Sequence, residues 1–125
     1  MSEFKFAAKV NVLGSEYSVE VKKFDEDEAF GRRHIDGYCD WLTRKIVLCD
    51  MATYPDWDHE LAETVEEAVK QALRHELVHA FYYESGLGSS SFKVDAPWAE
   101  NEEMVDWVAT QGLKLYKAWQ EAGAL

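Results

Sequence analysis

The strongest constraint on the fold is a long amphipathic helix predicted from Thr64 to about Glu84. Thr64-Val65-Glu66-Glu67 matches a capping box, in which Thr64 is the N-cap residue and the Glu67 side chain bonds back to it. Gly86 follows the segment and supplies a left-handed stop. A helix of this length needs a partner for its apolar face, so the rest of the chain should pack against it.

The second half of this helix carries His75-Glu76-Leu77-Val78-His79. Two histidines four residues apart project from one face of a helix and could bind one metal ion together. Glu76 follows the first histidine, where a carboxylate could take a proton from a metal-activated water. Both histidines share the arc of Val65 and Val69, and burying them without a ligand would be costly. The alternative is a partly exposed helix that carries these three residues by coincidence.

A catalytic zinc ion needs three protein ligands and an open position, so a third ligand should lie downstream. A second helix is predicted from a cap at Asp95 or Ala96, with Pro97 in its first turn, to about Gln120. On this helix Glu102 shares the arc that should face the core, whereas Glu103 shares a solvated arc. The core-facing arc contains Val105, Ala109 and Leu113, and the solvated arc contains Thr110, Lys114 and Lys117.

Glu102 is therefore the expected third ligand, because a carboxylate on an apolar arc needs a cation. Asp106 lies one turn later on the flank of the same helix. Its carboxylate could accept a hydrogen bond from a metal-binding histidine and so fix the orientation of that ring. The alternative for both residues is an ordinary surface acid in an acidic stretch.

The first half of the chain alternates apolar and polar residues, which is typical of strands. Residues 4–12 and 17–22 suggest a hairpin, followed by a charged connection or short helix over 24–33. Residues 37–42 and 45–49 suggest two further strands, joined at residues 43–44 in a turn that would set Cys39 opposite Cys49. We expect one α+β domain over residues 1–125, with a small twisted, mainly antiparallel sheet followed by two long helices that bracket the zinc site.

The composition excludes several classes of function. A formal net charge of −11 argues against a nucleic-acid-binding protein, whose surface would carry a basic patch. No apolar stretch is long enough to span a membrane, and the first residues do not resemble a secretory signal. Two cysteines are too few for a disulfide framework. From these observations together we expect a cytoplasmic protein that binds neither membranes nor nucleic acid.

The sequence resembles the gluzincin metallopeptidases, in which an HExxH motif precedes a downstream NExxxD segment. His75 to His79, followed by residues 101–106, has this arrangement, and the likeness is greatest to minimal members encoded by phages and mobile elements. The resemblance implies that His75, His79 and Glu102 bind zinc, that Glu76 is the general base and that Asp106 supports a histidine. It also implies a peptide or protein substrate.

Larger gluzincins stabilise the oxyanion with a tyrosine or histidine from a second domain, for which this chain is too short. Tyr54, His59, Tyr82 and Tyr83 are all candidates to replace that residue, and no spacing selects one of them. The expected activity is zinc-dependent peptide hydrolysis, with a peptide held along an edge strand at Lys45 to Leu48. The alternatives are a zinc-binding regulatory domain with little activity and a metal-free interaction module.

Overall fold

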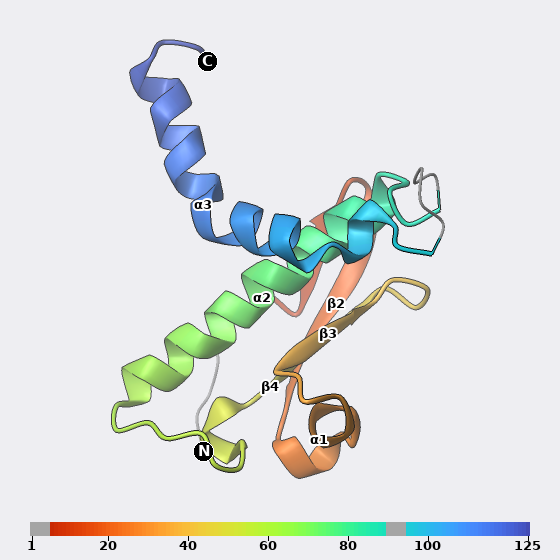
Figure 1. Ribbon diagram of the computed structural model, residues 1–125, viewed down its shortest axis with the longest axis vertical. Coiled ribbons are helices and arrows are strands. Elements are labelled where there is room, and N and C mark those ends of the chain that lie inside the picture. Colours follow the sequence, from red (N-terminus) through yellow and green to blue (C-terminus); the bar gives the residue numbers. More distant parts are fainter. Residues whose placement is uncertain (1–5, 90–94) are drawn as a thin grey trace.

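The computed structural model describes residues 6–89 and 95–125 and has an α+β fold (Figure 1). Within these two ranges, a four-stranded mixed sheet has the order β1-β2-β4-β3, and three α-helices lie between or after its strands. The strands are β1 (Lys9–Val12), β2 (Ser15–Lys22), β3 (Gly37–Asp40) and β4 (Lys45–Cys49), and the helices are α1 (Ala29–Arg33), α2 (Ala62–Glu84) and α3 (Glu102–Glu121). No helix in residues 6–89 or 95–125 is long and apolar enough to cross a lipid bilayer.

The predicted N-terminal hairpin is confirmed, since β1 pairs antiparallel with β2. Its two central turn residues, Leu13 and Gly14, both have positive φ angles of 51° and 93°. Turns of that kind match the right-handed twist of paired strands. The strand begins at Lys9, later than predicted, and the predicted start at Phe4 lies outside the described residues.

The strand β4 lies at the centre of the sheet, so the prediction of an edge strand at Lys45 to Leu48 is wrong. It pairs in parallel with β2 and antiparallel with β3, which leaves β1 and β3 as the edges. Ile46 to Cys49 are all buried, as expected for a strand covered on both faces. The turn over Trp41–Arg44 is longer than predicted, and Cys39 therefore pairs with Ile46 and not with Cys49.

The hydrophobic core lies between the sheet and α2. Ile46 and Leu48 of β4 and Tyr17 of β2 belong to one cluster with Val65 and Val69 of α2. The connection between β2 and β3 forms a 3-10 turn (Phe24–Glu26) and α1, which agrees with the predicted short helix. Its buried Phe30 joins the same core and packs near the ring of Tyr38 on β3.

The start of α2 differs from the prediction. The N-cap residue is Leu61, which makes no capping hydrogen bond through its side chain, and Thr64 lies inside the first turn. The backbone N–H of Thr64 bonds to the carbonyl of Leu61, so the helix cap lies three residues earlier than the predicted one, at residue 61 in place of 64. The end of α2 matches the prediction, because the helix stops at Glu84 and Gly86 has a φ of 94°.

The start of α3 also differs from the prediction. Pro97 precedes a separate 3-10 turn (Trp98–Glu100), and Asn101 is the N-cap of α3 through a hydrogen bond of 3.0 Å from the Met104 N–H. A cap at Asp95 or Ala96 is therefore wrong, since the chain turns once more before the helix begins. The first half of α3 lies across α2, whereas its second half turns away from the rest of the chain (Figure 1). Leu113, predicted to face the core, is 65% exposed.

Candidate metal centre

The helix α2 presents His75, Glu76 and His79 as one compact group. The two imidazole rings have centroids 4.9 Å apart, as the i, i+4 spacing on a helix predicts. One potential ligand atom from each of the three residues lies within 4.8 Å of the others. The group is therefore close enough to bind a metal ion.

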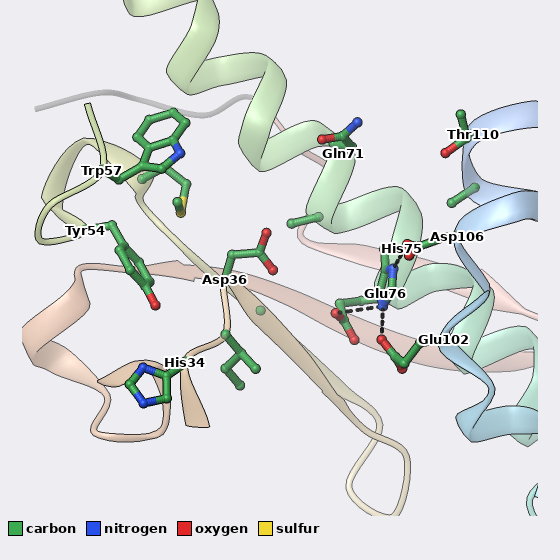
Figure 2. Close-up of a pocket in the computed structure, with 15 residues that line it drawn as sticks. His34, Asp36, Tyr54, Trp57, Gln71, His75, Glu76, Glu102, Asp106 and Thr110 are labelled. Carbon is green, nitrogen blue, oxygen red and sulfur yellow. Dashed lines mark hydrogen bonds and ion pairs between the residues drawn. The ribbon is translucent and has the colours of Figure 1, made fainter. Parts of the chain in front are cut away.

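The carboxylate of Glu102 approaches this group from α3 (Figure 2). Its two oxygens lie 2.8 Å from Nε2 of His79 and 3.1 Å from Nε2 of His75. Glu102 is the first residue of α3, directly after its cap at Asn101, so the helix start fixes where this side chain begins. Its side chain is 65% exposed, and it reaches the histidines from the rim of the cleft and not from the core.

The other nitrogen of each histidine meets a hydrogen-bond acceptor. Nδ1 of His75 lies 2.7 Å from Oδ1 of Asp106, as predicted, and Nδ1 of His79 lies 2.5 Å from the backbone carbonyl of Ala99. A carbonyl oxygen can only accept, so Nδ1 of His79 carries a proton, and in the neutral ring Nε2 is left with a lone pair. Ala99 gave no signal in the sequence, because a backbone carbonyl is common to every residue.

These contacts leave a conflict that a cation resolves. Both Nε2 atoms face the Glu102 carboxylate. If the imidazoles are neutral, each of these nitrogens is a hydrogen-bond acceptor that faces another acceptor, with no proton between them. A positive ion shared by His75, His79 and Glu102 would remove this conflict, and so would added protons on the rings or on the carboxyl group. Two imidazole nitrogens and a carboxylate oxygen are a donor set that suits zinc, and hydrogen-bonded outer nitrogens are typical of metal-binding histidines.

Glu76 is buried beside this group, with only 6% of its surface exposed. Gly37 on β3 lies beside it: a Cβ there would be in ordinary contact with Cγ of Glu76, at 3.6 Å, but crowded against a Leu48 methyl group and the Val47 carbonyl, both at 3.1 Å. Burial raises the pKa of Glu76 to about 7, although nearby His75 opposes this shift. For His75 itself, burial lowers the pKa but the carboxylates of Glu76, Asp106 and Glu102 outweigh it, so that the net shift is upward.

Two clefts meet at His75, Glu76 and Glu102. The larger, of about 750 Å³, extends from His75 and Glu76 towards Tyr54 and Trp57, and the smaller, of about 330 Å³, extends along β3 towards Tyr83. Of the four candidate oxyanion residues, Tyr54 lines the larger cleft and Tyr83 the smaller one, whereas Tyr82 and His59 line neither. The Tyr83 hydroxyl donates a hydrogen bond of 3.1 Å to Glu100.

The geometry of this centre is the basis for assigning it a function. The four residues predicted to hold or serve the metal meet at one place, and Asp106 contacts one of them as expected. No protein-family model, no curated protein and no solved structure matches the chain.

Proposed function

We propose that this chain is a zinc-dependent peptidase of the gluzincin type, with His75, His79 and Glu102 as the metal ligands and Glu76 as the general base. One observation carries the proposal. Each imidazole has its Nδ1 on an acceptor and its Nε2 on the same carboxylate, next to a buried glutamate at the meeting point of two clefts. This is the orientation that a metal-binding histidine pair requires.

The choice of Glu102 over Glu76 as third ligand follows from distances. The Glu102 oxygens lie within 3.1 Å of both Nε2 atoms, whereas the Glu76 carboxylate lies 3.9 Å from Nε2 of His75. Glu76 therefore lies beside the proposed ligands, where it could act on a bound water. A zinc ion held by His75, His79 and Glu102 would supply an acidified water and polarise the carbonyl of the bond to be cleaved.

The remaining roles belong to residues of the chain. Glu76 accepts a proton from the attacking water and passes it to the leaving amine. Asp106 and the Ala99 carbonyl hold the two imidazoles in one tautomer. The edge strand β3 borders the smaller cleft through Tyr38 and Cys39, so an extended peptide could add to this strand, in place of the β4 edge that the sequence predicted.

The test is digestion of a peptide library by the zinc-loaded wild-type chain and by Glu76→Gln, with the metal content of each measured in parallel. We expect the variant to retain zinc and to lose cleavage, because the amide cannot take up a proton. Glu103→Gln is the matched control and should cleave like wild type. Cleavage that survives in Glu76→Gln would refute the mechanism, and loss of zinc from that variant would make Glu76 a ligand.

The second candidate is a metal-binding regulatory domain without peptidase activity. The place of Tyr83 favours it, since this hydroxyl is already bonded to Glu100 and its ring lies against Trp41, with centroids 5.2 Å apart. A tyrosine held in this way is less free to stabilise an oxyanion. Stoichiometric zinc in the wild-type chain together with no cleavage of any library peptide would decide for this alternative.

A further inference from the structure

We infer that the larger cleft contains a subsite for a basic side chain of a bound peptide, formed by Asp36, Tyr54 and Trp57. The inference rests on the proposed function for the class of ligand, a peptide, and adds which residue that peptide presents. Arginine fits the subsite better than lysine, because its planar guanidinium can stack on an aromatic ring while it pairs with a carboxylate.

Asp36 occupies the middle of the cleft. It lies between the pair Tyr54 and Trp57 on one side and the His75–Glu76 group on the other (Figure 2). Its backbone is fixed at the start of β3, where its carbonyl accepts a hydrogen bond of 2.9 Å from the Cys49 N–H. If a peptide reaches the metal centre along this cleft, a side chain next to the bond to be cleaved would therefore lie near Asp36.

Asp36 is an exposed carboxylate and, among the described residues that line this cleft, the one acid without a side-chain partner. Glu102 contacts both imidazoles, Asp106 bonds to His75, and Glu76 lies 3.9 Å from His75. Within the described parts of the chain, the Asp36 side chain has no hydrogen bond or ion pair, and no lysine or arginine lines the cleft. A cationic side chain is the ligand that a carboxylate free of protein partners favours.

Each of the two aromatic rings packs on a further ring that does not line the cleft. Trp57 stacks on His59 with ring centroids 5.1 Å apart, and Tyr54 packs edge-on against Phe24 at 5.0 Å. Both rings are half-buried, so part of each remains available to a ligand. Cation–π contact with either ring adds to the pairing with Asp36, and little ordering is needed when the ligand binds.

The test measures binding separately from cleavage. Zinc-loaded Glu76→Gln is titrated calorimetrically with a library of peptides in matched pairs, in which arginine at each position is exchanged for its neutral analogue citrulline. We expect the arginine peptides of one position to bind about fivefold more tightly than their citrulline partners, the size of a partly exposed ion pair. Adding Asp36→Asn should reduce this preference to less than about twofold, and Asp36→Glu should restore it.

Asp25→Asn is the matched control, because Asp25 is an exposed acid outside the cleft and its removal changes the net charge equally. It should leave the preference for arginine intact. An arginine preference that persists in Asp36→Asn, or its absence from the parent protein, would overturn the inference. If the preference for arginine depends on Asp36 but the zinc-loaded wild-type chain cleaves no peptide, the subsite is supported and the peptidase activity is refuted.

Discussion

Replacing Asp106 tests whether the orientation of His75 matters for metal binding. Its Oδ1 lies 2.7 Å from Nδ1 of His75, and its side chain is 69% exposed. Asp106→Ala therefore opens no cavity in the core, and its effect should fall on the imidazole alone. Loss of such a supporting carboxylate typically weakens metal binding about 10- to 100-fold, which corresponds to about 1.4–2.7 kcal/mol.

The structure also predicts the order of two variants. In Asp106→Asn the amide oxygen still accepts the Nδ1–H bond without its charge, so zinc affinity should lie between those of wild type and Asp106→Ala. Neither variant should abolish binding, because the Ala99 carbonyl still orients His79. Zinc affinity is measured by competition with a chromophoric chelator, and unfolding in urea confirms that the fold is retained.

Glu103→Ala is the control, since Glu103 is an exposed acid in the first turn of α3, the helix that also carries Asp106. It removes the same charge from the helix without touching His75. If Asp106→Ala binds zinc within about twofold of Glu103→Ala, long-range charge and not orientation accounts for the effect. That result would refute the role assigned to Asp106.

Two further predictions concern the fold. The Tyr38 hydroxyl bonds to Asp27 and is the largest cause of the lowered pKa of that carboxyl, so Tyr38→Phe should cost about 1.5 kcal/mol at pH 7. A carboxyl whose pKa is lowered by folding stabilises the fold at pH values above its unfolded pKa of about 3.9, and this stabilisation is lost as the pH falls through the folded pKa. The difference in unfolding free energy between wild type and Tyr38→Phe, measured in urea, should therefore be smaller at pH 2.5 than at pH 7. An equal difference at both pH values would contradict this prediction. Burial raises the pKa of Cys39 to about 12 and of Cys49 to about 11, so few of these thiols are ionised at pH 8. Alkylation of the two cysteines at pH 8 should therefore be at least about 100-fold slower in the native chain than in the chain unfolded in urea. Equal rates in the two states would contradict this prediction.

The sequence predicted those parts of the site that depend on local spacing. His75, Glu76 and His79 lie on one helix, so their mutual positions follow from helical geometry. Glu102 was placed by its helical arc, but that arc does not face the core along its whole length, since Leu113 is largely exposed. What brings Glu102 to the histidines is the start of α3, which its cap at Asn101 fixes.

The prediction failed where pairing joins distant segments. The parallel pairing of β2 with β4 places β4 at the centre of the sheet, and no local pattern in either strand encodes this neighbour. Helix starts were wrong for a related reason. Thr64 matches a capping box, yet α2 extends back to Ala62 because packing can override a capping preference worth about 1 kcal/mol. At α3, Asn101 is as strong a cap as Asp95, and only the extra turn at Trp98–Glu100 decides between them.

The central claim is that His75, His79 and Glu102 form a metal centre. Its most direct test is the zinc content of the purified chain by elemental analysis, for wild type, Glu102→Ala and Glu103→Ala. We predict about one zinc ion per chain in wild type and Glu103→Ala and far less in Glu102→Ala. A wild-type chain that binds no stoichiometric metal, or a Glu102→Ala chain that retains zinc as firmly as Glu103→Ala, would contradict the claim.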